Sequence, residues 1–329
     1  MTNVLRRNVL RGFSSQKFVA VSRFVAVSRL ATWRLVAVLA MTLVLTGCSV
    51  RELAINKVAG MLTSGTSGWA ADDDPELVGE ALPFALKLVE SLLAEVPENE
   101  DLLLTACSGY TQYTYAFVEL DAIKIESEDY YEAKRLRSRA LKLYLRGLDY
   151  CLRALDLRSP GFRQKVKTDP VGAVAPFGKD AVPLMVWAAT AWGGGISLAL
   201  DQPDIVVDFP AVRALLERAF EHDPTFEKGA LHELLMAADA LPESMGGSLE
   251  RARKHYEKAI ELSNGQRPST YVIWASSVSV QQQNREEFEN LLNKALAIDP
   301  EVDPNSRLLT MVYQEAAQAL LDQIDDLFI

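Results

Sequence analysis

The chain has 329 residues, of which 49% are hydrophobic and 24% charged, and a formal net charge of −10. Its first 47 residues hold seven of the 34 Lys and Arg residues and no Asp or Glu, so the remainder carries 27 basic against 44 acidic residues, a net charge of −17. Such an acidic surface repels phosphate backbones, which argues against nucleic-acid binding. Beyond the leader the chain is long enough for one large domain or an array of helical repeats.

Residues 1–47 have the order of a bacterial lipoprotein signal peptide. A basic region precedes the apolar segment Leu35–Leu45, which is too short to span a bilayer as a helix, and the small residue Gly47 stands just before Cys48. We therefore expect cleavage before Cys48 and an acyl chain such as palmitate that anchors this residue to a membrane. An ordinary signal peptide or a short anchor helix is the alternative. Ser49 favours the outer membrane over the inner one.

The region after Cys48 is divided by composition. Residues 51–62 predict a short helix, and the Ser-, Thr- and Gly-rich residues 63–71 predict a flexible spacer. Asp74 followed by Pro75 is typical of a helix start, because a capping carboxylate and a proline in the first turn both suit that position. We expect three parts: a signal peptide (1–47), a lipid-anchored helix and spacer (48–71) and a helical domain (72–329).

From residue 75 onward the apolar residues recur with the helical period of 3.6, and a repeat is superimposed on it. A tetratricopeptide unit has two antiparallel helices, and its second helix carries small and apolar residues at spacings of four and three before a turn signal. The predicted fold is all-α, with tetratricopeptide-like helical hairpins forming an α-solenoid or bundle; a generic helical bundle is the alternative. The matching triplets are Ala85, Val89, Leu92; Gly147, Cys151, Ala154; Val212, Leu216, Ala219; Ala252, Tyr256, Ala259; and Phe288, Leu292, Ala295. Their predicted stops are Pro97, Pro160, Asp223-Pro224, Ser263-Asn264-Gly265 and Asp299-Pro300.

Two segments interrupt this pattern. Residues 158–180 are rich in Pro and Gly and predict a long connection. Residues 181–200 contain no charged residue, which formally suffices for a membrane span. Pro183 and Gly193–Gly195 weaken a lone spanning helix, and acidic rather than basic residues flank the segment. We expect instead a helix buried at the centre of the domain.

Motifs for catalysis, metal binding or cofactor binding are absent from the sequence. It has no Gly-rich phosphate loop, no GxSxG and no HExxH, and its three histidines, His222, His232 and His255, show no metal-ligand spacing. We therefore predict a protein that is not an enzyme and needs no cofactor. Cys107 and Cys151 both lie in apolar helical patterns; we favour two free core thiols, although an oxidising compartment permits a disulfide.

Aromatic residues are the candidates for a ligand cavity. In repeat arrays the first helices line the concave surface, where aromatic rings can form the walls of a binding site. The competing interpretation is that each of them is an ordinary core residue. The predicted cavity residues are Tyr110, Tyr113, Phe117, Trp187, Trp192 and Trp274.

A basic stripe stands out against the acidic background. Its members recur at spacings of four, three, four and seven, which places them along one face of a helix. We predict that Arg139, Lys142 and Arg146 bind a partner or an acidic group; a solvated face paired with nearby acids is the alternative. The stripe consists of Arg135, Arg139, Lys142, Arg146 and Arg153.

A set of segments follows one another in a characteristic order: residues 53–59 (LAINKVA), 72–84 (DDDPELVGEALPF), 86–93, 103–115, 139–150 (RALKLYLRGLDY), 182–198 and 242–265. In these segments and their order, the chain resembles the T-component lipoproteins associated with tripartite ATP-independent periplasmic (TRAP) transporters. It implies an all-helical, tetratricopeptide-like fold, a homotrimer, and a hydrophobic channel or cavity in each protomer. It also implies that the protein acts together with the periplasmic solute-binding component of the transporter.

The expected function is that of a non-enzymatic, lipid-anchored periplasmic accessory to a TRAP-type secondary transporter. It would bind the solute-binding component, and its cavity would take a small apolar or carboxylate solute. A repeat scaffold for envelope assembly is the alternative, and it requires no cavity. A hydrolase lacks support because the sequence contains no nucleophile–base pair.

Overall fold

The computed structural model describes residues 66–328, which form helices and contain no strand. The predicted leader, Cys48 and the predicted helix over residues 51–62 lie outside the described residues. The all-α prediction is confirmed. The first helices are α2 (Thr66–Ala70), α3 (Pro75–Glu95), α4 (Glu100–Thr114), the π-helical turn η1 (Tyr115–Glu119), α5 (Leu120–Ile125) and α6 (Tyr130–Arg158).

The remaining elements continue in the same manner to the carboxyl end. The middle of the chain forms α7 (Phe162–Thr168), α8 (Pro170–Val174), α9 (Val182–Ser197), α10 (Pro203–Val206), α11 (Phe209–His222) and α12 (Ala230–Asp239). The last part forms α13 (Leu249–Ser263), α14 (Pro268–Trp274), a second π-helical turn η5 (Ala275–Ser279), α15 (Arg285–Leu296), α16 (Arg307–Asp322) and α17 (Ile324–Leu327).

Helix ends follow the predicted turn signals. The Asp74 carboxylate accepts a hydrogen bond from the Leu77 amide at 2.9 Å, and Pro75 occupies the first turn of α3, as predicted. Helix α13 ends on Asn264 in the left-handed conformation, followed by Gly265 at φ 69°. Helices α3, α6, α11, α13 and α15 all end at or just before a predicted stop. Local capping and proline chemistry therefore sets the lengths of these helices.

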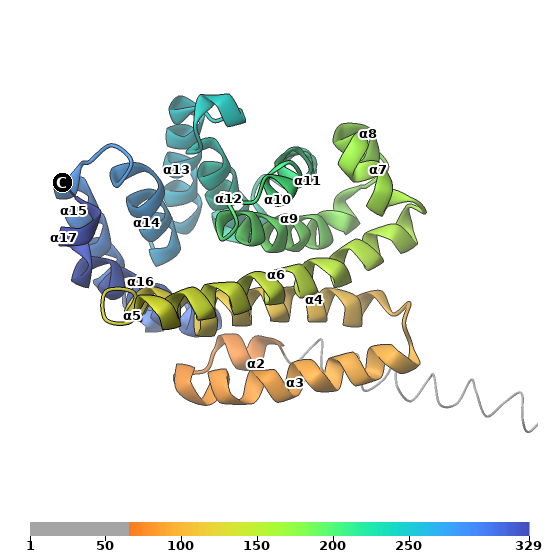
Figure 1. Ribbon diagram of the computed structural model, residues 1–329, viewed down its shortest axis with the longest axis horizontal. Helices are drawn as coiled ribbons and strands as arrows, with labels where there is room; N and C mark the ends of the chain where they lie inside the picture. The colour runs from red at the N-terminus through yellow and green to blue at the C-terminus, as the bar shows by residue number, and fades with distance from the viewer. Residues whose placement is uncertain (1–65, 329) are drawn as a thin grey trace, which may run out of the picture. The chain divides into compact units, whose positions relative to one another are not determined.

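Neighbouring helices pack in chain order. Helix α3 contacts α4, α4 contacts α6, α6 contacts α9 and α9 contacts α11, and the same succession runs through α12 and α13 and from α14 to α16 (Figure 1). An ideal solenoid repeat touches only its neighbours. Here α16 also contacts α5 and α3, so the last long helix returns to the first ones. The two ends of the described helical array therefore meet.

The segment predicted as a long connection is folded into helices. Residues 158–180 contain α7 and α8, so the expectation of an extended loop is wrong. Its glycines and prolines mark helix boundaries: Gly161, at φ 85°, precedes α7, and Pro170 opens α8 with Asp169 as its cap. Within the predicted spacer, Thr66–Ala70 forms the short helix α2, which contacts α16.

Helix α9 is buried between other helices, as its uncharged sequence predicts. It contacts α4, α6 and α11, and residues on all of its sides are buried, among them Met185, Val186 and Ala191. Within the described region no helix combines the length and the apolar character that crossing a bilayer requires. An apolar helix of this kind is stabilised by removal of its surface from water in the centre of the domain.

Helix α6 approaches both of its neighbours closely because small residues lie at the contacts. A Cβ atom added to Gly147 would lie 3.1 Å from the Cys107 carbonyl oxygen on α4. On the other side, a Cβ added to Gly194 of α9 would lie 2.8 Å from the Tyr144 ring. The contact at Gly147 is tighter than nine in ten real Cβ contacts, and a Cβ at Gly194 would force the Tyr144 ring to shift, so close packing favours glycine at both positions.

Cys107 and Cys151 form a disulfide between α4 and α6, with their Cα atoms 5.4 Å apart. The favoured prediction of two free thiols is therefore wrong. Both residues are fully buried, and the tight α4–α6 packing brings their side chains together. The apolar pattern correctly places both cysteines in the core, but the distance between them depends on how the two helices pack.

Replacing Gly194 with alanine is expected to lower the free energy of unfolding by about 1–3 kcal/mol, because its methyl group displaces the Tyr144 ring. Gly193 is the matched control. A Cβ added there would lie 3.8 Å from its nearest neighbour, so Gly193→Ala should raise stability by up to about 1 kcal/mol through helix propensity. Urea denaturation of both variants measures the difference. Equal effects would contradict the packing argument.

Candidate functional site

The predicted aromatic residues of the first long hairpin lie in the core. Tyr110 and Tyr113 are 3% and 8% exposed and share a hydrophobic cluster with Leu86 and Leu136. Phe117, in η1, is half-buried, and its ring lies against Gly79 of α3. These rings therefore pack between α3, α4 and α6, and their role in ligand binding stays a prediction.

The predicted basic stripe on α6 lies over these tyrosines. The Arg139 guanidinium carbon is 5.8 Å from the centre of the Tyr113 ring, and Arg139 also donates to the Tyr113 hydroxyl at 3.2 Å. The Arg146 guanidinium carbon is 5.5 Å from the centre of the Tyr110 ring. Each arrangement is a cation–π contact. Two sets of residues predicted separately therefore form one surface.

We call this surface the arginine–tyrosine face. Helix α3 contributes one acid to it, Glu90, whose carboxylate accepts hydrogen bonds from the Tyr150 hydroxyl at 2.8 Å and from the Lys87 ammonium at 2.6 Å. Burial acts to raise the pKa of Glu90, but the hydrogen bonds from Lys87 and Tyr150 lower it overall, so the carboxylate is ionised at neutral pH. The face comprises Glu90, Tyr110, Tyr113, Arg139, Lys142, Arg146, Tyr150 and Arg153.

Most cations of this face lack a carboxylate partner. Arg146 reaches Glu90 at 3.4 Å, and Arg135, outside the face, pairs with Glu132 at 2.5 Å. Within the described part of the chain, no carboxylate lies within ion-pair distance of Arg139, Lys142 or Arg153; Arg153 donates to the Pro97 carbonyl instead. The alternative of a stripe paired with nearby acids therefore applies to only two of its five members. The face keeps surplus positive charge on an acidic chain.

The predicted tryptophans lie elsewhere. Trp192 is buried in α9 and Trp187 is half-buried on the same helix. Trp274 packs in the carboxyl-terminal core cluster, with its ring centre 4.7 Å from that of Tyr256. Trp274 and Tyr113 thus belong to separate clusters, so the six aromatic candidates do not form one wall. A surface pocket of about 460 Å³ is lined instead by Glu100, Arg158, Pro176, Phe177, Gly178, Asp180 and Ala181.

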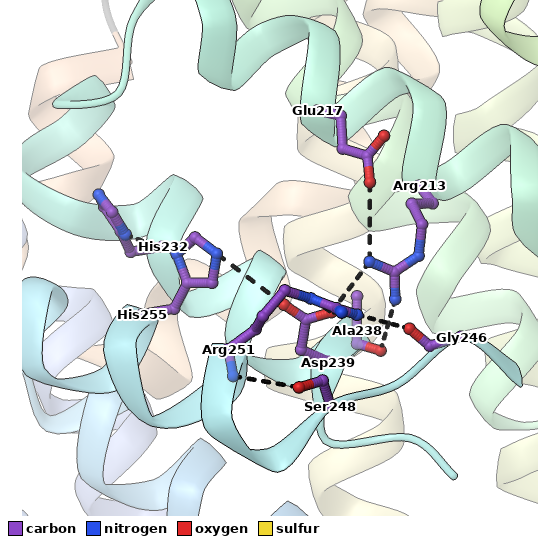
Figure 2. A network of polar contacts seen from close by, with 9 residues as sticks. All are labelled: Arg213, Glu217, His232, Ala238, Asp239, Gly246, Ser248, Arg251 and His255. Atoms are coloured by element: carbon purple, nitrogen blue, oxygen red, sulfur yellow. Dashed lines mark hydrogen bonds and ion pairs between the residues drawn. The ribbon is translucent and has the colours of Figure 1, made fainter. Parts of the chain in front are cut away.

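A second polar network links α11, α12 and α13 around Asp239, which is 2% exposed. Its carboxylate accepts from Arg213 at 2.9 Å and from Arg251 at 2.8 Å (Figure 2). Arg213 also donates to the Ala238 carbonyl, and Arg251 to the Gly246 carbonyl. No motif or spacing in the sequence predicts this network. The local hint in the sequence is Asp239 itself, an acid on the apolar face of α12. Burying a lone carboxylate is costly, so its position implies a cationic partner.

Two of the three histidines that seemed scattered in the sequence meet beside this network. The Nδ1 atoms of His232 and His255 are 2.8 Å apart, and His255 Nε2 lies 3.9 Å from the Asp239 carboxylate (Figure 2). Burial and the charge of His255 lower the pKa of His232 to about 4, so the ring is neutral at pH 7. In the region that the structure describes, no group of three or more His, Cys, Asp or Glu side chains is placed to hold a metal ion.

The family model described as TRAP transporter T-component matches residues 71–328. The chain belongs to this family. It is also similar to an uncharacterized protein of Treponema pallidum (strain Nichols), with 28% identity over 309 residues that cover 88% of this chain and 96% of the relative. Membership of this family makes the protein an accessory component of a TRAP transporter, as the resemblance predicts.

In this T-component, Asp239→Ala is expected to lower the free energy of unfolding by about 2–5 kcal/mol, because Arg213 loses its buried counter-charge. Glu217→Ala is the matched control. Glu217 lies 3.8 Å from the same arginine, but its side chain is 57% exposed, so its loss should cost less than about 0.5 kcal/mol. Thermal denaturation compares the two variants. A similar loss for both would mean that the network contributes little to stability.

The histidine pair makes stability depend on pH. The pKa of His232 is lower in the folded chain, about 4, than its ordinary value of 6.5, so the unfolded chain binds more protons between these values. Stability should therefore decrease as the pH falls from 6.5 towards 4, by about 1–3 kcal/mol. His232→Asn removes the titrating ring and should flatten this part of the profile. Denaturation at several pH values measures it, and an unchanged slope in the variant would contradict the assignment.

Proposed function

We propose that this T-component is a non-enzymatic, lipid-anchored periplasmic accessory that binds the solute-binding component of its TRAP transporter. Family membership supports the transporter association. The observation on which the partner role rests is the arginine–tyrosine face, where surplus positive charge is held on a rigid helix of an otherwise acidic chain. Charge complementarity of this kind steers association and selects a partner with an acidic surface.

The proposed location outside the cytoplasm has two supports. The leader of residues 1–47 ends just before Cys48, the proposed site of lipid attachment, and the buried Cys107–Cys151 disulfide suits a chain that folds in an oxidising compartment. We propose attachment to the periplasmic side of the envelope, with Ser49 favouring the outer membrane.

The arginine–tyrosine face is suited to docking because its cations are held in place by aromatic rings. Arg139, Lys142 and Arg146 are all exposed, yet the two arginines lie over buried tyrosines of α4. An arginine stacked on a rigid ring loses less conformational freedom on binding than one that moves freely in water. Arg139 and Lys142 can therefore bind carboxylates of a partner without first breaking an ion pair of their own.

Two further features complete the proposal. A cavity of the helical array would hold a small solute, as the resemblance implies. The chain would assemble as a homotrimer, and exposed apolar side chains on α3 offer surface for a subunit contact, since Phe84 is 76% exposed and Leu77 56% exposed.

The docking proposal predicts that Lys142→Glu weakens binding of the cognate solute-binding component by about fivefold or more, because the substitution reverses an unpaired charge in the middle of the face. Binding is measured by biolayer interferometry between the two purified proteins at several salt concentrations. The association rate and its dependence on salt should change more than the dissociation rate.

Lys294→Glu is the matched control, because Lys294 is an exposed lysine on α15 that has no carboxylate within ion-pair distance among the described residues. It should leave the affinity unchanged. Equal weakening by both variants would show a nonspecific charge effect. If the unmodified protein does not bind its cognate component at any salt concentration, the transporter role loses its main support, and the repeat-scaffold hypothesis takes its place.

A further inference from the structure

The surface pocket of about 460 Å³ lies at the carboxyl end of helix α6, where the arginine–tyrosine face also ends. Arg153, the last cation of the face, donates to the Pro97 carbonyl at 3.1 Å. Arg158, the last residue of α6, donates to the Glu100 carboxylate at 2.8 Å. Pro97 lies in the turn between α3 and α4, and Glu100 begins α4. The face and the pocket therefore meet at the same turn.

The apolar part of the pocket lining is fixed to the body of the domain. Phe177 and Ala181 are 4% and 1% exposed, and the Phe177 ring makes an edge-to-face contact with Phe162 of α7, with ring centres 5.2 Å apart. Arg218 of α11 donates to the backbone carbonyls of Ala175 and Phe177 at 2.9 Å each. Because α7 and α11 both hold this segment, the pocket is formed before any partner binds.

The charged part of the lining consists of Glu100, Arg158 and Asp180, two carboxylates and one guanidinium. Arg158 donates to one oxygen of each acid, Oε2 of Glu100 at 2.8 Å and Oδ2 of Asp180 at 2.9 Å. Each carboxylate keeps a second oxygen that can accept hydrogen bonds. The Asp180 side chain is 81% exposed, so a partner can reach it. The neighbouring Lys179 is paired with Asp223 at 3.7 Å. Negative charge thus exceeds positive charge in this pocket, next to a face of the opposite sign.

We infer that this pocket receives a lysine or arginine side chain of the solute-binding component. The aliphatic stem of that side chain lies against Pro176 and Phe177, and its charged head reaches the second oxygens of Glu100 and Asp180. An acidic side chain would meet two carboxylates, and Arg158 is already bonded to both of them. The inference rests on the proposed docking function and specifies which charges the partner must present.

The pocket and the face together define a charge pattern for the partner. An α-helix rises about 1.5 Å per residue, so Arg158 lies about 18 Å along α6 from Arg146. The partner presents an acidic patch to Arg139, Lys142 and Arg146 and, about 18 Å away, one basic side chain to the pocket. A partner docked in the reverse direction would bring like charges together at both ends. The basic side chain therefore fixes the direction in which the partner lies along α6.

The test is biolayer interferometry with the purified full-length protein and its cognate solute-binding component. Asp180→Lys should weaken binding by about fivefold or more, because it places a like charge against the basic side chain of the partner. Asp201→Lys is the matched control. Asp201 is an exposed acid just beyond the carboxyl end of α9, whereas the pocket lies at the amino end of that helix.

The control makes the same change of charge, so it separates the pocket from the overall field of the protein. Added positive charge attracts an acidic partner, and Asp201→Lys should therefore leave the affinity unchanged or raise it. Glu100→Gln is a milder second variant. It keeps an acceptor for Arg158 but removes the charge, and it should weaken binding by about threefold. Circular dichroism melting shows which variants are folded.

The basic side chain of the partner can be identified by charge reversal. Each exposed lysine and arginine of the solute-binding component is changed to glutamate in turn. One of these component variants should bind Asp180→Lys more tightly than the unmodified component does, because the two reversed charges then attract. If none of them does, the pocket receives no basic side chain.

The inference is also overturned if Asp180→Lys leaves the affinity unchanged or raises it while Lys142→Glu still weakens it. The docking function would then stand without the pocket. Failure of the two unmodified proteins to bind each other would instead overturn the docking function, and the inference with it. The two failures are therefore distinguishable.

Discussion

The structure depends on the close packing of helix α6 between α4 and α9. Gly147 permits the approach to α4, and Gly194 of α9 makes room for Tyr144. Several features follow from this one constraint. The Cys107–Cys151 disulfide needs the short α4–α6 distance, the arginines of α6 reach the tyrosines of α4 for the same reason, and the Tyr144 hydroxyl is held at Glu119. Interiors are packed densely enough that one added methyl group at such contacts disturbs all of these features.

Charge is distributed unevenly in this acidic T-component. Among the described residues, surplus positive charge gathers on the exposed face of α6, whereas the buried carboxylates Asp239 and Glu233 are neutralised by arginines. Glu119 differs from both because, among the described residues, it has no arginine within ion-pair distance and accepts a hydrogen bond from the Tyr144 hydroxyl. The ion pairs of Asp239 and Glu233 with arginines maintain the arrangement of the helices, since removing one partner leaves an uncompensated buried charge.

Sequence patterns predicted most of the helices and little of the polar interior. Asp74 and Pro75 start α3 and Asn264 ends α13 as expected, because capping involves residues within one turn of each other. The aromatic residues of α4 and the basic stripe of α6 were each identified from spacing alone. Their stacking was not foreseen, because it depends on the rotation of one helix relative to the other. The pairing of His232 with His255 was missed for the same reason.

The sequence by itself determined the helical class, the ends of the principal helices, the burial of α9 and the net charge. These are properties of short segments, set by periodicity, capping and composition. Only the tertiary structure decided that Cys107 bonds to Cys151, that α16 returns to contact α5, and that Asp239 meets two arginines from other helices. Such contacts join residues far apart in the chain, and their distances depend on how whole helices pack. The hydrogen bond from Tyr144 of α6 to Glu119 of η1 is a further case, because the two residues are 25 positions apart in the chain.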